Sequence, residues 1–280
     1  MRLFQWALDG LLFSGTYTAC VAVGASVCTS LLLKTSIQPY LLLFTFCGTL
    51  VSYNLHWWLS PAAFLSARGR AWSRIHRNKR PVVIAISALI AVFAFTKLSG
   101  PCMVVSLVAA GATLLYSLPK VPLPQTVWLR KMARGKTLYL TAVWTLVTVV
   151  LPMVAAHAYD KEAFLLLAHR FFFIYALCLL FDLRDREQDR QEGISSLATH
   201  LPQQVHRIVF LGLAACSALP LPFMSATSGT GLAGLILSLF ALIILYKSAR
   251  ATRSDVFYYL LLDGLMAAPV VTYGIKAAFH

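Results

Sequence analysis

Half of the acidic residues of this chain lie in one short segment. The sequence has ten Asp and Glu residues, and five of them fall within FDLRDREQDRQEG, residues 181–193. Asp182, Asp185 and Asp189 are spaced so that they share one face if the segment is helical. Three like charges on one face need a cation, and Mg²⁺ takes carboxylate oxygens while leaving room for substrate phosphates. We therefore expect these three aspartates to hold Mg²⁺ and to take part in catalysis.

Arginines alternate with these acids. Arg184, Arg186 and Arg190 lie on the other faces of the same expected helix, where they can neutralise the acids or bind a phosphate. We expect Arg184 to bind substrate. The alternative is a solvated loop of mixed charge without chemistry, which we disfavour because the chain places so few acids elsewhere.

The composition indicates which elements must position these residues. Hydrophobic residues make up 59% of the 280 residues and charged residues only 12%. Several apolar runs reach the roughly 20 residues that a helix needs to cross a bilayer. We predict an all-α, multi-pass membrane protein, a single transmembrane domain over 1–280 with about nine transmembrane helices around a central cavity. The expected helices are 10–33, 39–60, 81–97, 100–118, 137–157, 163–182, 204–222, 229–247 and 256–277.

Basic residues are distributed unevenly among the connections, and this accounts for the net charge of +14 without nucleic acid as a partner. Every second connection carries a cluster of Lys and Arg, as cytoplasmic loops do. We therefore expect a cytoplasmic N-terminus and a C-terminus outside. Because no eukaryotic targeting segment is recognisable, we expect a bacterial inner membrane. The predicted cytoplasmic connections are 61–80, 119–136, 183–203 and 248–255.

Asn54 and His56 lie at the cytoplasmic end of the second expected helix. One interpretation places them across the cavity from Asp182, where they orient a headgroup or carry protons. The other assigns them to an aromatic belt at the membrane interface, together with Trp57 and Trp58. We count Asn54 and His56 as candidate catalytic residues.

Arg170 and Asp263 are charges inside expected membrane spans. Such residues are costly in lipid and usually face a cavity or a partner. We expect Asp263 to face the cavity and bind substrate. For Arg170, a structural pair and a side chain that extends to the interface are both open.

The acidic segment resembles a motif of a known family. DLRDREQDRQEGISSL, residues 182–197, is similar to the second aspartate-rich motif of the UbiA superfamily of intramembrane prenyltransferases, DxxDxxxDxxxG followed by Thr/Ser-Leu. The expected topology and the chain length also agree with that family. The resemblance implies Mg²⁺-dependent transfer of an isoprenyl group from a prenyl diphosphate to a lipophilic acceptor, such as a quinone precursor or a tetrapyrrole, within membrane lipid.

The family's first aspartate-rich motif, close to NDxxDxxxD, is altered in this chain. Asn54 is retained, but the three Asp positions are occupied by Leu55, Trp58 and Ala62. The resemblance therefore implies that half of the metal clamp is missing and that cationic side chains bind part of the diphosphate. Tyr116 belongs to the segment YSLPK, which is similar to the family's Tyr-x-x-x-Lys. The further candidates for substrate binding are Arg68, Tyr116, Lys120, Arg130 and Lys136.

Three functions are compatible with these patterns. The first is a UbiA-type prenyltransferase. The second is a degenerate relative that binds an isoprenoid or another lipid without ionising a diphosphate. The third is a transporter of an amphipathic anion, which is disfavoured because the charges cluster at one membrane face and not at the midplane.

Overall fold

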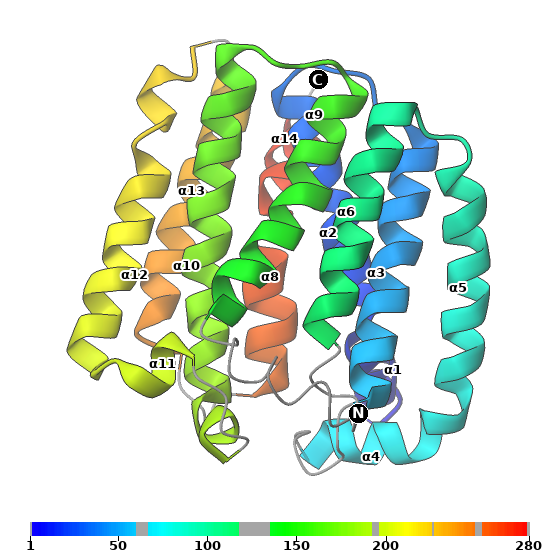
Figure 1. Ribbon diagram of the computed structural model, residues 1–280. Coiled ribbons are helices and arrows are strands. Elements are labelled where there is room, and N and C mark those ends of the chain that lie inside the picture. Colours follow the sequence, from blue (N-terminus) through cyan, green and yellow to red (C-terminus); the bar gives the residue numbers. More distant parts are fainter. Residues whose placement is uncertain are drawn as a thin grey trace.

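The computed structural model describes residues 2–59, 67–117, 135–191, 196–225, 227–249 and 254–278, and the regular elements in these ranges are all helices. The long helices form one bundle, with the N- and C-termini at opposite ends (Figure 1). In chain order the elements are α1 (Arg2–Phe13), α2 (Thr16–Leu32), α3 (Pro39–Leu59), α4 (Ala67–His76), η2 (Arg77–Lys79), α5 (Arg80–Phe95), α6 (Gly100–Ser117), α8 (Lys136–Thr145), η6 (Leu146–Val150), α9 (Leu151–Ala155), α10 (Lys161–Gln191), α11 (Leu197–His200), α12 (Gln203–Ala218), η7 (Leu221–Phe223), α13 (Gly229–Tyr246), η8 (Val256–Leu262) and α14 (Ala268–Ala278).

The predicted all-α membrane architecture is confirmed, but the count of nine spans is not. Within the described ranges, five helices are long and apolar enough to cross a membrane, and α1 with α2 adds a sixth if the bent pair is one span. Each of the nine expected stretches is largely helical where it is described. Several are shorter or interrupted, so length and hydropathy alone do not qualify them as spans.

Burial separates the central helices from the lipid-facing ones. In the span Lys161–Glu187 of α10, 56% of the most apolar window is buried, against 17% in Arg68–Phe95, which contains α5. Figure 1 accordingly shows α5 at the edge of the bundle. Leu166, Phe173 and Leu180 of α10 belong to the largest core cluster. The helix that carries the acidic segment is therefore the best-anchored element of the fold.

The first expected helix, 10–33, is in fact two helices with a bend of 62° between them. Gly15 lies at the bend with φ of +77°, a left-handed conformation that favours glycine,. A Cβ at Gly15 would also lie 3.2 Å from the Cβ of Tyr53. The bend places α1 beside α4, at the lower end of the bundle in Figure 1.

Two predicted connections contain more helix than expected. The predicted connection 61–80 contains α4 and η2, and α10 continues to Gln191 instead of ending at residue 182. This extension keeps Asp182, Asp185 and Asp189 on one continuous helix. The end of the bundle where α3 and α10 finish and α8 begins is called the acidic end below.

The last helical segment is irregular. A π-helix, η8, covers Val256–Leu262, and a break follows before α14 begins at Ala268. Arg170, which is only 2% exposed, donates from Nη1 to the carbonyl of Met266 in that break at 2.8 Å. The buried guanidinium therefore satisfies a carbonyl that the break releases, and its burial excludes a side chain that extends to the membrane interface,.

Candidate active-site cavity

A cavity of about 620 Å³ lies between α2, α3, α5, α6, α8, α10 and η8. Most of its wall is apolar, with aromatic contributions from Phe44, Trp57 and Trp144. Ionisable side chains from four helical segments join this wall. They are His56, Lys136, Asp182, Arg184, Asp185, Tyr53, Tyr259 and Asp263.

Two of the three expected catalytic aspartates line the cavity. Asp182 is 4% exposed and accepts a hydrogen bond from the Thr137 hydroxyl on α8. Asp185 accepts from Nε of Arg184 at 2.7 Å and from Nη2 of the same residue at 3.4 Å. α10 therefore presents one carboxylate bound to a neutral donor and one paired with a cation.

Asp189 is not among the lining residues. Its Oδ1 lies 3.0 Å from Nζ of Lys136, and its side chain is 2% exposed. The same Nζ lies 4.0 Å from Oδ2 of Asp185, so Lys136 bridges the two carboxylates. Burial raises the pKa of Asp189 above its ordinary value, and the Lys136 ammonium opposes that shift. Lys136 thus connects the cavity to a buried anion behind it.

Arg184 is held by aromatic rings as well as by a carboxylate. Its guanidinium carbon lies 5.0 Å from the ring centroid of Phe181, 5.2 Å from that of Tyr258 and 4.8 Å from that of Tyr259. Rings at this distance attract a cation through their quadrupoles. The planar guanidinium is consequently fixed beside the cavity, with its Nε and Nη2 engaged by Asp185.

Asp263 is a third carboxylate in the cavity wall. It lies directly after η8, is 4% exposed and lines the cavity. Thr18 on α2 and Arg184 on α10 are the polar groups that act on it. Since Tyr258 packs on Phe181 with ring centroids 5.6 Å apart, Asp263 lies roughly a turn farther from the acidic end than Asp182.

Of the two candidates on α3, one lines the cavity and the other does not. His56 lines the cavity. Asn54 does not: it is 2% exposed, and its Nδ2 donates to the carbonyls of Ser14 at 2.8 Å and Leu50 at 2.9 Å. Because Ser14 precedes the bend between α1 and α2, this contact fixes the bend. We expected Asn54 to face Asp182 across the cavity, and the structure does not place it there.

The remaining candidates lie away from the cavity or outside the described residues. Arg68 on α4 forms an ion pair with Asp9 on α1 and does not line the cavity. This pair joins two surface helices. Lys120, Arg130 and the side chain of Tyr116 belong to the part of the chain that is not described.

The expected three-aspartate metal site is not formed by these side chains alone. Among the described residues, no group of three or more His, Cys, Asp or Glu side chains is placed to hold a metal ion. Lys136 lies between Asp185 and Asp189 instead. Asp182 and Asp185 nevertheless present carboxylates to the cavity, and Mg²⁺ is commonly bound by one or two carboxylates together with substrate phosphates. The donor set therefore fits Mg²⁺ that binds together with a diphosphate.

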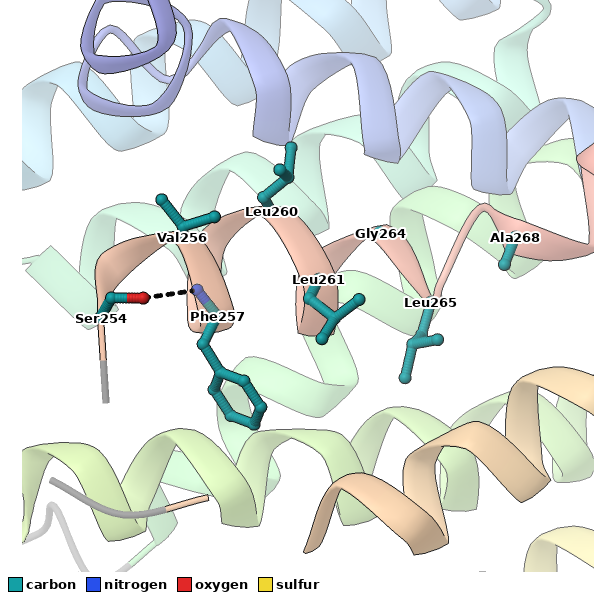
Figure 2. Close-up of a pocket in the computed structure, with 8 residues that line it drawn as sticks. All are labelled: Ser254, Val256, Phe257, Leu260, Leu261, Gly264, Leu265 and Ala268. Carbon is teal, nitrogen blue, oxygen red and sulfur yellow. Dashed lines mark hydrogen bonds between the residues drawn. The ribbon is translucent and has the colours of Figure 1, made fainter. Parts of the chain in front are cut away.

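A second groove, of about 710 Å³, runs along η8 to the start of α14. Figure 2 shows its lining, with Val256 and Leu260 on one side of the helix and Phe257, Leu261 and Leu265 on another. Among the described residues, the lining contains no ionisable side chain, and the Ser254 hydroxyl accepts from the backbone N–H of Phe257. The described part of this groove therefore offers no charge for a phosphate or a metal ion.

Sequence reasoning missed several cavity residues. Thr137, the partner of Asp182, directly follows Lys136, which was a candidate. Tyr259 precedes Asp263 by four residues, a spacing that places both on one helix face. This spacing could have identified Tyr259 as a cavity residue. Trp57 was assigned to an interfacial belt but lines the cavity. No local pattern distinguishes Thr137 or Trp57 from ordinary packing residues.

Comparisons with known proteins agree with this architecture. The chain matches the model of the UbiA prenyltransferase family over residues 73–257. Its fold is similar to the apo structure of a UbiA homolog from Aeropyrum pernix K1, with a TM-score of 0.63 and 14% identity, covering 94% of this chain and 98% of that one. At that identity the likeness concerns the fold alone. A search of curated protein sequences gave no match.

Proposed function

The chain belongs to the UbiA prenyltransferase family, and from that premise we propose that it transfers an isoprenyl group from a prenyl diphosphate to a lipophilic acceptor. The observation that carries the proposal is the polarity of the cavity. Lys136, Arg184, Asp182 and Asp185 lie together at its acidic end, and apolar side chains form most of the remaining wall. A prenyl diphosphate has the same division between a charged head and an apolar chain.

Two cations and two carboxylates divide the work on the diphosphate. Arg184 and Lys136 supply positive charge to the phosphate oxygens, Lys136 as a point charge and Arg184 from the guanidinium that Asp185 and three aromatic rings hold in place. Asp182 and Asp185 would hold Mg²⁺, whose chemistry would be the neutralisation of negative charge on a diphosphate. His56, on the facing helix, orients the head of the substrate across the cavity.

The apolar wall and Asp263 act after the carbon–oxygen bond of the donor breaks. Water is excluded by the apolar lining, so the allylic cation survives until an acceptor reaches it. Trp144, which lines the cavity, stabilises a cation through its ring. As the acceptor bonds to the allylic carbon, it loses a proton, and the Asp263 carboxylate takes that proton.

The altered first motif favours a second candidate function. Of the positions where the family has Asp, Leu55 lines the cavity and Trp58 is 41% exposed. α3 therefore offers no carboxylate for a second metal ion among its described residues. A protein with only one metal-binding half could bind an isoprenoid diphosphate without ionising it, which would make it a binding protein.

The proposal includes a location. The acidic end faces the cytoplasm of a bacterial inner membrane, as the distribution of basic residues predicts. The N-terminus would then be cytoplasmic and the C-terminus outside, which is compatible with their opposite ends in Figure 1. The acceptor is a lipophile such as a quinone precursor or a tetrapyrrole, which enters from the bilayer.

The proposal is tested by binding of geranyl, farnesyl and geranylgeranyl diphosphate to purified protein in detergent, with and without Mg²⁺. We expect Mg²⁺-dependent binding that Asp185→Asn weakens at least about tenfold, since a charge-assisted contact is lost. Glu187→Gln is the matched control, because its side chain on the same helix is 69% exposed. Equal binding of the prenyl diphosphates by wild type and Asp185→Asn would reject both the prenyltransferase and the alternative of a protein that binds an isoprenoid diphosphate without ionising it.

A further inference from the structure

Many hydroxyls in this bundle follow one rule. In the described helices, Ser and Thr side chains repeatedly donate to the backbone carbonyl one turn earlier, which satisfies them inside their own helix. Such pairing is favoured in a membrane, where water does not reach the helix. The residues that do this are Ser26, Thr29, Thr49, Ser52, Thr113, Thr141, Thr145, Thr148 and Ser238.

Thr45 on α3 and Ser106 on α6 depart from the rule. Each is only 1% exposed. Each hydroxyl is shielded and has no hydrogen-bond partner, and no other Ser or Thr hydroxyl in the described ranges shares this condition. A buried hydroxyl without a partner is costly, so two of them indicate a missing partner.

Both hydroxyls belong to the same cavity and lie at the same depth. Thr45 and Ser106 line the cavity together with the acidic end. Each is the sixth residue after the start of its helix, Pro39 for α3 and Gly100 for α6, and these two helices are in contact. Figure 1 shows α3 and α6 side by side. The pair therefore lies at the end of the cavity far from the aspartates.

The separation from the charged end follows from α3. Thr45 and His56 line the cavity from one continuous helix and lie eleven residues apart. At a rise of 1.5 Å per residue, the two positions are about 16 Å apart along the axis. The two hydroxyls without a partner are thus well separated from the charged end of the cavity.

We propose that Thr45 and Ser106 form a binding subsite for a neutral oxygen function, a hydroxyl or a carbonyl, at the far end of a lipophilic ligand. The inference deepens the proposed function, on which it rests for the nature of the ligand's charged end. A plain hydrocarbon tail would leave both hydroxyls unpaired. One terminal oxygen accepts from either hydroxyl, and a terminal hydroxyl can also donate to one of them. The subsite therefore selects an oxygenated isoprenoid over its hydrocarbon counterpart.

The test compares farnesol with its ω-hydroxy derivative, two neutral probes that need neither Mg²⁺ nor a diphosphate. Binding is measured by quenching of tryptophan fluorescence, since Trp57 and Trp144 line the cavity. We expect the wild type to bind the ω-hydroxy probe about fivefold to tenfold more tightly, as one gained hydrogen bond implies. The double variant Thr45→Val/Ser106→Ala should lose this preference.

Thr49→Val is the matched control. Thr49 lines the same cavity, but its hydroxyl already donates to the carbonyl of Thr45 at 2.7 Å. The preference should persist in this variant. Three results would overturn the subsite. They are equal binding of the two probes by the wild type, no binding of either probe, and an unchanged preference in the double variant. Equal binding is also the result expected if water occupies the two hydroxyls.

The same probes separate the subsite from the proposed function. Asp185→Asn should retain the preference for the ω-hydroxy probe while it loses affinity for farnesyl diphosphate. If the wild type does not bind farnesyl diphosphate, the proposed function is rejected. The preference for the ω-hydroxy probe would still test whether Thr45 and Ser106 form the subsite.

Discussion

Replacing Lys136 by methionine removes the cation that pairs with a buried carboxylate. The side chain of Asp189 is 2% exposed and lies 3.0 Å from Nζ of Lys136, which is 19% exposed. Removing one partner of a buried pair costs about 3–5 kcal/mol, because the other charge is left unpaired. Lys136→Met should therefore lower the free energy of unfolding by about 3 kcal/mol, the lower limit of that range, since Lys136 is partly exposed.

Arg68 supplies the matched control. Its ion pair with Asp9 has side chains that are 31% and 21% exposed, and such pairs contribute at most about 1 kcal/mol. Unfolding of each variant in mixed detergent micelles is followed with increasing denaturing detergent. The double variant Lys136→Met/Asp189→Asn should recover most of the lost stability. The reasoning is refuted if Lys136→Met is no more destabilising than Arg68→Met, or if the double variant recovers nothing.

The pH dependence of Lys136→Met has a defined sign. Burial raises the pKa of Asp189 in the folded protein, and without Lys136 only the Ser196 side chain still opposes the shift. A carboxyl whose folded pKa exceeds its unfolded value stabilises the fold fully below the unfolded pKa and loses that contribution as pH rises through the folded pKa. The stability gap between Lys136→Met and wild type should consequently narrow in acid.

Three further outcomes follow from the geometry. Asn54→Leu removes the hydrogen bond to Ser14 at the α1–α2 bend and the one to Leu50 within α3, and should cost about 1–3 kcal/mol in denaturant unfolding; unchanged stability would contradict its structural role. Gly15→Ala should cost about 1–2 kcal/mol, because residue 15 has φ of +77°,, and a neutral result would show that the bend adapts. Asp263→Asn should retain diphosphate release but lose the prenylated product, both followed by chromatography; normal product yield would remove Asp263 from proton transfer.

The fold was largely predictable because its signals are local. Apolar runs of membrane-spanning length report burial in lipid, and the spacing of Asp182, Asp185 and Asp189 places them on one helix face whatever surrounds it. The structure keeps all three on α10. The excess of exposed apolar side chains on α5 likewise follows from a sequence that has no polar face.

The details of the site were not predictable, because they depend on contacts between helices. Asp189 is paired with Lys136, which lies fifty-three residues earlier in the chain. Asn54 donates a hydrogen bond to the carbonyl of Ser14, which lies forty residues away in the chain. That carbonyl lies at a bend that the apolar pattern does not show. Spacing within one segment carries no information on which partner another helix will bring.

Release of inorganic diphosphate tests the central claim most directly. Purified protein is incubated with geranyl, farnesyl or geranylgeranyl diphosphate in detergent with membrane lipid, with and without Mg²⁺. The proposal predicts Mg²⁺-dependent release that Asp185→Asn abolishes and Glu187→Gln preserves. Tight Mg²⁺-dependent binding with no release from any of the three donors would contradict the enzyme and leave a protein that binds isoprenoid diphosphates without cleaving them.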